Sequence, residues 1–216
     1  MDYVNTIVLF FQDGGIFMYP IVLILAFGCS IALERYLYLR AANRANQGVW
    51  NQVVACISKG DITRAIEIST ASSAAMGKVL GYGLQRTRTG SRREQVETAM
   101  EEGLMEVMPR LEKRTHYLAI FANIATLLGL LGTIIGLIQA FTAVATASPA
   151  EKADMLSASI SVAMNTTAFG LMVAIPLLLA HALLQTKTTE LVDNLEMSAV
   201  KVLNMISDRQ GRENKS

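Results

Sequence analysis

Hydrophobic residues in this chain gather into three long runs, separated by charged and polar sequence. Ile16–Leu33 and Tyr117–Ala147 contain no Asp, Glu, Lys or Arg, and Met155–Thr186 carries only the titratable His181. A helix needs about twenty apolar residues to cross the hydrocarbon core of a bilayer. The pattern therefore predicts an all-α integral membrane protein with three transmembrane helices, at residues 16–39, 117–147 and 155–186.

The first fifteen residues are interpreted separately from the first span. Val4–Phe11 is apolar but too short to cross a bilayer, so it either lies along the membrane surface or forms a disordered leader. Met1–Leu33 contains no Lys or Arg, so it lacks the basic start of a secretory signal. The first run is therefore expected to be a retained helix.

The cations are distributed very unevenly between the segments that connect the runs. None of the nineteen Lys and Arg precedes Glu34, thirteen lie from Arg35 to Arg114, Lys152 is the one between the last two runs, and five follow. Because cytoplasmic loops carry the excess of Lys and Arg, residues 1–15 and 148–154 are expected to be periplasmic. Residues 40–116 are expected to form a cytoplasmic helical domain and residues 187–216 a cytoplasmic C-terminal tail.

Helix signals are frequent in the charged segment. Gly60-Asp61 precedes a helical stretch, and Ser91 with Glu94 forms a capping box that opens another. After Ser91 no strong stop appears before Ala147, since Gly103 and Pro109 weaken or kink a helix without ending it. We therefore expect one long helix that leaves the cytoplasmic domain and continues through the membrane as the second span.

Motifs that would indicate an enzyme or a cofactor site are missing from the sequence. It contains no phosphate-binding loop, no nucleophile elbow and no metal-ligand spacing among its two His and two Cys. Cys29 falls in a span and Cys56 outside the spans, so no disulfide is expected. Basic residues alternate with acidic ones, which disfavours nucleic-acid binding. We expect a protein that is not an enzyme and needs no cofactor or metal.

The second span carries a stripe of small residues at alternating steps of three and four. Its members are Ala119, Ala122, Thr126, Gly129, Thr133, Gly136, Ala140, Ala143 and Ala147. Small residues let helix backbones approach closely in lipid, so Gly129 and Gly136, with the neighbouring Gly132, are assigned to helix packing. Close packing without any transport role is the simpler interpretation of this stripe.

The third span repeats the pattern and adds polar residues. Ala163, Thr167, Gly170 and Ala174 share one face. At 100° per residue, Asn165 points about 160° away from Thr167. We expect it to hydrogen-bond a neighbouring helix, because its own helix cannot satisfy all the donors and acceptors of its side-chain amide. Pro176 is expected to kink or loosen the helix.

His181 also lies in the third run, about 40° around the helix from Thr167. It is either a candidate proton exit toward the cytoplasm or an interfacial residue at the end of the span.

Three stretches resemble one family. "ATLLGLLGTIIGLIQAF" (125–141), "TTAFGLMVAIP" (166–176) and "GGIFMYPIVLILAFGCSIALERYLYL" (14–39) are similar, in the same order, to signatures of the ExbB/TolQ/MotA proton-channel subunits. The resemblance covers about residues 14–184. It implies a homopentamer in the bacterial inner membrane that surrounds an ExbD/TolR-like single-span partner. The resulting complex uses the proton gradient to drive a TonB-like or TolA-like periplasmic protein.

Two positions depart from the family pattern. Thr126 stands where Pro is frequent, and Val162 stands where ExbB and TolQ members usually have a membrane Glu. Apart from Glu34 at the cytoplasmic end of the first span, the membrane part of the chain contains no carboxylate, and the resemblance implies that an Asp of the partner supplies it. Thr133 and Thr167 are then expected to line the ion pathway.

Chain length disfavours the flagellar branch of the family, whose members are longer and have four spans. ExbB-like energising of TonB-dependent import is preferred over a TolQ-like role in envelope maintenance and over a non-conducting scaffold. The choice between H⁺ and Na⁺ stays open, because hydroxyl oxygens can also coordinate a cation.

Overall fold

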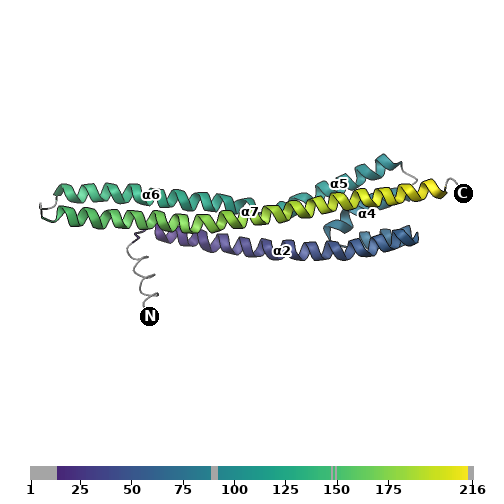
Figure 1. Ribbon diagram of the computed structural model, residues 1–216, viewed down its shortest axis with the longest axis horizontal. Coiled ribbons are helices and arrows are strands. Elements are labelled where there is room, and N and C mark those ends of the chain that lie inside the picture. Colours follow the sequence, from purple (N-terminus) through teal and green to yellow (C-terminus); the bar gives the residue numbers. More distant parts are fainter. Residues whose placement is uncertain (1–13, 89–91, 147, 149, 214–216) are drawn as a thin grey trace, which may run out of the picture. The chain divides into compact units, whose positions relative to one another are not determined.

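The computed structural model describes residues 14–88, 92–146, 148 and 150–213, and every regular element among them is a helix. Figure 1 labels α2, α4, α5, α6 and α7. The helices are α2 (Met18–Lys59), α3 (Ile62–Ala71), α4 (Ala75–Thr87), α5 (Arg93–Glu112), α6 (His116–Thr146) and α7 (Lys152–Glu213). The expected surface helix at Val4–Phe11 lies outside the described residues.

Residue contacts divide the chain into two compact units. One, called the apolar unit here, comprises Met1–Glu34 and Arg114–Leu183; the other, called the charged unit, comprises Arg35–Lys113 and Leu184–Ser216. Helices α2 and α7 contribute residues to both units. Of the nineteen Lys and Arg, only Arg114 and Lys152 belong to the apolar unit.

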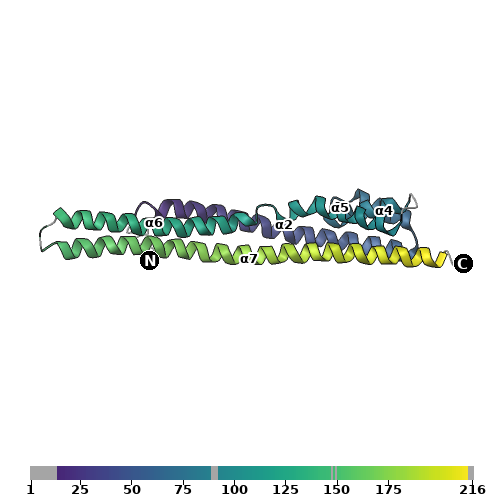
Figure 2. The same cartoon turned by 90° about the horizontal axis from the view of Figure 1, so that it is seen from above.

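Three helical stretches are long and apolar enough to cross a membrane, which confirms the predicted number of spans. They lie in α2, in α6 and in the first part of α7. In the apolar unit, α6 and α7 run side by side in both views (Figures 1 and 2). Large apolar side chains such as Phe27, Leu127 and Leu183 are exposed on the outside. A soluble surface rarely exposes so much contiguous apolar area, whereas a lipid-facing surface does.

Glycines set the distance between α6 and α7. A Cβ placed on Gly129 would lie 3.1 Å from the Cα of Thr167, and one on Gly170 would lie 2.7 Å from the carbonyl oxygen of Ala125. A Cβ on Gly136 would lie 2.8 Å from the Cβ of Ala163. The two backbones are therefore in direct contact, as the small-residue stripes predict.

The first part of α2 also packs against α7 through a glycine, but this glycine faces a side chain and not the backbone. A Cβ on Gly28 would lie 2.6 Å from a methyl group of Leu177, and Met18 and Ile21 are fully buried. At the other end of this stretch, a carboxylate oxygen of Glu34 lies 2.9 Å from a guanidinium nitrogen of Arg114. Both side chains are about half exposed, so this surface ion pair adds little stability.

The expectation of one helix from Ser91 to Ala147 is wrong. Gly103 and Pro109 lie within α5, as expected, but the helix ends at Glu112 and α6 begins only at His116. Lys113 is extended, and Arg114 has a φ of 66°, a left-handed conformation that costs a non-glycine residue about 1–2 kcal/mol. The sequence shows no stop here because the turn contains neither glycine nor proline.

Contacts distant in sequence compensate for this turn. In the apolar unit, Arg114 pairs with Glu34, and Nδ1 of His181 lies 3.1 Å from the carbonyl oxygen of Thr115. In the charged unit, the buried guanidinium of Arg35 donates to the carbonyl of Leu111, in the last turn of α5. A cation near the carbonyl end of a helix is electrostatically favourable.

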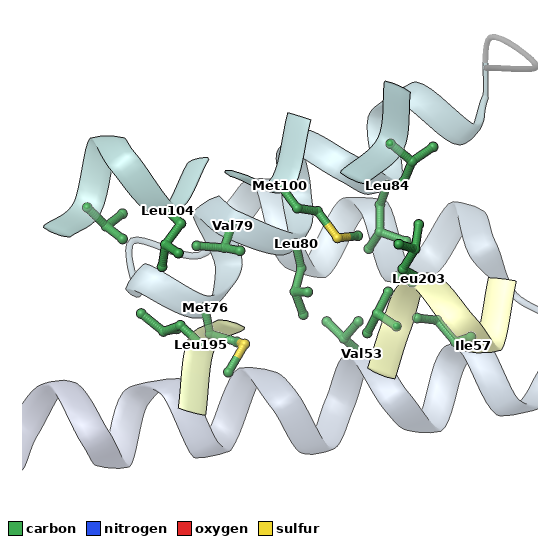
Figure 3. Packing of buried hydrophobic residues seen from close by; sticks show 14 of the residues in the cluster. Val53, Ile57, Met76, Val79, Leu80, Leu84, Met100, Leu104, Leu195 and Leu203 are labelled. Carbon is green, nitrogen blue, oxygen red and sulfur yellow. The ribbon is translucent and has the colours of Figure 1, made fainter. Parts of the chain in front are cut away.

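The core of the charged unit joins residues of α2, α3, α4, α5 and α7. Val53 and Ile57 of α2 belong to one buried cluster with side chains of α4, α5 and the end of α7 (Figure 3). Leu80 and Leu195 are fully buried in this cluster. Burying a Leu contributes about 1.5–3 kcal/mol, so these residues supply the charged unit with an apolar core of its own.

Helix caps in the charged unit follow two different plans. Asp61, which precedes the helical stretch noted in the sequence, is the N-cap of α3, and its Oδ1 accepts a 2.9 Å hydrogen bond from the Arg64 amide. Helix α4 has no cap of its own; instead Oδ1 of Asn46, a residue of α2 only 4% exposed, accepts from the Met76 amide at 2.9 Å. The distant side chain thus replaces a local N-cap.

The predicted capping box at the start of α5 is shifted. The N-cap is Arg92, whose amide donates to the side chain of Gln95 at 3.1 Å, so Gln95 takes the role predicted for Glu94. Ser91, the predicted cap, lies outside the described residues. The shift is one residue along the chain.

An exposed polar cluster links α4 to α5. Glu106 accepts hydrogen bonds from Nζ of Lys78 and from the hydroxyl of Tyr82, both at 2.7 Å. The bond from Lys78, followed by that from Tyr82, lowers the pKa of the Glu106 carboxyl, and the bond to Glu106 raises the pKa of Tyr82. Beside this cluster, a Cβ on Gly103 would lie 3.0 Å from the Cα of Val79, so α4 and α5 also touch backbone to backbone.

The glycine contact leads to a test with a matched control. Gly170→Ala places a methyl group 2.7 Å from the Ala125 carbonyl, so we expect a loss of about 1–3 kcal/mol. Gly48→Ala, on α2, meets nothing within 4 Å and should stabilise its helix by up to about 1 kcal/mol. Thermal midpoints measured in one detergent should move in opposite directions; equal midpoints for the two variants would contradict the close contact.

The remote cap of α4 is tested by Asn46→Ala. The change leaves the buried Met76 amide without its acceptor, and we expect a loss of about 1–2 kcal/mol. Hydrogen exchange of the amides in the first turn of α4 should accelerate. Asn51→Ala, at an exposed position of the same helix, is the control and should leave that exchange unchanged. Unaltered exchange in both variants would show that Asn46 does not cap α4.

Candidate functional site

The hydroxyl of Thr167 lies at the contact between α6 and α7. Its Oγ1 donates to the carbonyl oxygen of Gly129 at 2.7 Å, and the side chain is partly buried. Gly129 and Thr167 each belong to a small-residue stripe predicted for their own helix, and the structure brings the two residues together. The bond uses the only proton of the hydroxyl, while its oxygen keeps lone pairs that can accept from another group.

Thr166 is a polar residue of this contact that sequence analysis did not single out. It is 2% exposed, and its Oγ1 lies 2.6 Å from the carbonyl oxygen of Gly14 and 3.1 Å from that of Val162. Its methyl carbon would lie 2.5 Å from a Cβ on Gly132. The sequence signal that could have indicated this contact is Gly132, a small residue of the second span that is not a member of the predicted stripe.

The buried stripe of α6 is therefore offset from the predicted one. Ala122, Gly129 and Ala140 are buried as expected, but the other buried positions of the second span are Leu118, Ala125 and Gly132. Thr126 is exposed, and Thr133 is only partly buried.

Thr133 lies at the edge of the contact instead of within it. Its Oγ1 donates to the carbonyl oxygen of Leu130, one turn earlier in α6, at 2.6 Å. In the described part of the chain, no hydrogen bond joins Thr133 to Thr167. Their shared role in an ion pathway stays a prediction.

Asn165 is partly buried, and the described residues offer its side chain no hydrogen bond within the chain. Farther along α7 on a similar side of the helix, Phe169 is 9% exposed and Met172 is 57% exposed. This face of α7 is thus only partly covered by the chain itself. The predicted bond from Asn165 to a neighbouring helix remains a prediction about an assembly.

His181 is bound to the turn between α5 and α6. Its Nδ1 lies 3.1 Å from the Thr115 carbonyl oxygen, which can only accept, so Nδ1 carries the proton in this contact. The hydroxyl of Thr115 is buried and has no hydrogen-bond partner among the described residues. The imidazole therefore anchors the turn that precedes α6. Pro176, one and a half turns earlier, lies inside α7, which continues through it.

Electrostatics limit what the site can do by itself. Val162, at the position of the family's usual Glu, is partly buried, and one of its methyl carbons would lie 3.5 Å from a Cβ on Gly15. Glu34 follows the first apolar run and is paired with Arg114. The hydroxyls of Thr133, Thr166 and Thr167 can pass a hydrogen bond on, but none of them holds a proton reversibly near neutral pH.

Comparison with known proteins agrees with this architecture. A family model described as the MotA/TolQ/ExbB proton channel family matches residues 71–197. A putative biopolymer transport protein, ExbB-like 1, of Synechocystis sp. is 30% identical over 187 residues, which cover 85% of this chain and 72% of that protein.

Two further relatives extend the comparison. A putative ExbB homolog of Methanothermobacter thermautotrophicus is 29% identical over 200 residues, covering 91% of this chain and 69% of its own length. The Tol-Pal system protein TolQ of Haemophilus influenzae is 35% identical over 83 residues, covering 38% of this chain and 36% of its own. The family match covers more than half of the sequence, including α6 and the small-residue contact with α7. This chain belongs to the MotA/TolQ/ExbB proton channel family.

Proposed function

We propose that the chain is the ExbB-like subunit of a proton-driven motor in the bacterial inner membrane. It assembles as a homopentamer around an ExbD/TolR-like single-span partner, and the complex transmits work to a TonB-like periplasmic protein. In this role it energises TonB-dependent transport across the outer membrane. The chain itself catalyses no reaction and carries no cofactor.

The observation that carries the proposal is the absence of a carboxylate from all three apolar runs in a member of a proton channel family. A proton that crosses about 30 Å of hydrocarbon needs a group that binds and releases it, because an isolated charge there costs many kcal/mol. Val162 offers no such group. The acid must therefore come from another chain, and the family resemblance assigns it to an Asp of the partner helix.

Thr133 and Thr167 supply the polar surface that this foreign acid meets. Both hydroxyls already donate to carbonyls, at Leu130 and Gly129, so their oxygens are oriented and free to accept a further hydrogen bond. The direct backbone contact of α6 with α7 keeps the two helices at a constant separation.

The distribution of charge supports the orientation. Seventeen of the nineteen Lys and Arg belong to the charged unit, and the positive-inside rule assigns such a unit to the cytoplasm. The N-terminus and the link at residues 148–154 are then periplasmic, and the C-terminus is cytoplasmic.

The comparisons favour an ExbB-like role over a TolQ-like one by coverage. The relatives named ExbB homolog and ExbB-like 1 align with 91% and 85% of the chain, whereas the TolQ match covers 38%. A TolQ-like subunit with a TolA-like protein is the second candidate. Identifying the single-span protein that co-purifies with the chain distinguishes the two.

Reconstitution tests whether the partner supplies the acid. We expect liposomes that contain this chain alone, loaded with a pH-sensitive dye, to show only background proton flux, because its three apolar runs lack a titratable carboxylate. Adding the partner should produce flux, and changing the partner's membrane Asp to Asn should abolish it. Robust flux from the lone chain would sink the proposal.

The threonines are tested with shape-conserving variants. Thr133→Val and Thr167→Val remove the hydroxyls; we expect the pentamer to persist, since a membrane hydrogen bond averages only about 0.6 kcal/mol, while ion-driven activity falls. Thr142→Val is the control, because that exposed hydroxyl bonds back to Ile138 within α6. Full activity of the Thr133/Thr167 double variant would contradict the pathway.

Two variants of His181 distinguish a role in anchoring the turn before α6 from a role as proton exit. In His181→Gln the amide can still donate to the Thr115 carbonyl, so we expect unchanged transport from about pH 6 to about pH 8. His181→Leu removes the donor and should lower the thermal midpoint. If the Gln variant is as stable as the wild type but loses the pH dependence of transport, His181 serves as a proton exit.

A further inference from the structure

A polar cavity of about 310 Å³ lies between α2 and α7 in the charged unit. On α2 it is lined by residues spaced at helical intervals, and on α7 by a second such series. The lining residues are Tyr36, Leu39, Arg40, Asn43, Lys187, Glu190, Leu191 and Asn194. Leu39 and Leu191 are buried and form an apolar floor, while the polar members are exposed at the rim.

The two cations at this cavity are not used within the chain. In the part of the chain that the structure describes, Arg40 and Lys187 make neither an ion pair nor a hydrogen bond, although Glu190 lies on the same rim. Both side chains are exposed. The cavity therefore presents two uncompensated positive groups and one carboxylate, with a net charge of +1, and the amides of Asn43 and Asn194 add donors.

The position of the cavity along both helices is equally informative. Lys187 is the first charged residue after the apolar run Met155–Thr186, and Arg40 follows Glu34 by six residues, about 9 Å along a helix. The headgroup layer of a bilayer is roughly 5–8 Å thick on each side, and a long Arg side chain reaches back toward it. Tyr36 and Leu37, both exposed, lie on the membrane side of Arg40. Tyrosines are typical of the membrane interface.

We propose that this cavity binds the headgroup of an anionic phospholipid. Arg40 offers its planar fork and Lys187 a point charge to the phosphate, and the two asparagines donate to the ester and hydroxyl oxygens. The acyl chains lie along the exposed apolar surface of α2 that includes Leu37. Basic pockets between membrane helices bind acidic lipids for the same electrostatic reason. The inference rests on the membrane position of the helices and holds whichever motor the chain serves.

Native mass spectrometry of the intact detergent-solubilised protein tests the site with phosphatidylglycerol and phosphatidylcholine. We expect phosphatidylglycerol to be retained and phosphatidylcholine to be lost. Since a cation near the surface contributes about 1 kcal/mol, Arg40→Gln and Lys187→Gln should each weaken retention about fivefold. Glu190→Gln removes a repelling charge and should strengthen it.

The control is Lys201→Gln. Lys201 lies on α7 at the adjoining cavity, fourteen residues beyond Lys187 and thus about 21 Å farther from the membrane, so its loss should not change lipid retention. Inorganic phosphate, added at millimolar concentration, should not displace the lipid.

Four outcomes overturn the proposal. The first is equal retention of the two lipids, and the second is unchanged retention in an Arg40/Lys187 double variant that keeps the native oligomeric mass and thermal midpoint. The third is weaker retention in Glu190→Gln, and the fourth is displacement of the lipid by phosphate alone. Weaker retention in Glu190→Gln would instead indicate a zwitterionic headgroup whose ammonium pairs with this carboxylate.

Discussion

Direct contact between the backbones of α6 and α7 is the constraint on which the rest of the apolar unit depends. Two apolar helices in lipid gain nothing from the hydrophobic effect when they associate, because lipid tails are as apolar as their side chains. Contact must therefore be gained through dispersion and hydrogen bonds. Gly129 and Gly170 let the backbones touch, and only at this separation does the hydroxyl of Thr167 reach the Gly129 carbonyl. The same contact holds the side chains of the proposed pathway in position.

Much of this arrangement could be predicted because lipid imposes simple rules on sequence. The three apolar runs and the small faces of the second and third spans follow from length and helical period. The exact phase does not. Thr133 and Gly132 are adjacent and both small, so period alone cannot decide which one faces α7; the methyl group of Thr166, which fills the space beside Gly132, decides it.

The interruption between α5 and α6 could not be predicted for a related reason. Local propensity at Lys113 and Arg114 favours a continuous helix, and the contacts that stabilise the turn come from Glu34 and His181, both far away in the sequence. The cap that Asn46 provides to α4 is equally invisible to local rules. Pattern analysis thus misses polar side chains that act on a distant backbone group. It also misses the unpaired rim cations Arg40 and Lys187, because in sequence each looks like any other single charge that follows a membrane span.

The hydrogen bond from Thr166 to the carbonyl of Gly14 also bears on how the protein is made. It joins residues 152 positions apart, across the start of the first span and the middle of the third. At about 5–20 residues per second, a ribosome needs roughly 8–30 s to make the intervening chain. During that interval the first span is in the membrane without Thr166, Leu177 or any other residue of its later neighbour α7. Until then the first span must be held in the bilayer by its own hydrophobicity, and its packing contacts with α7 form only when the last span inserts.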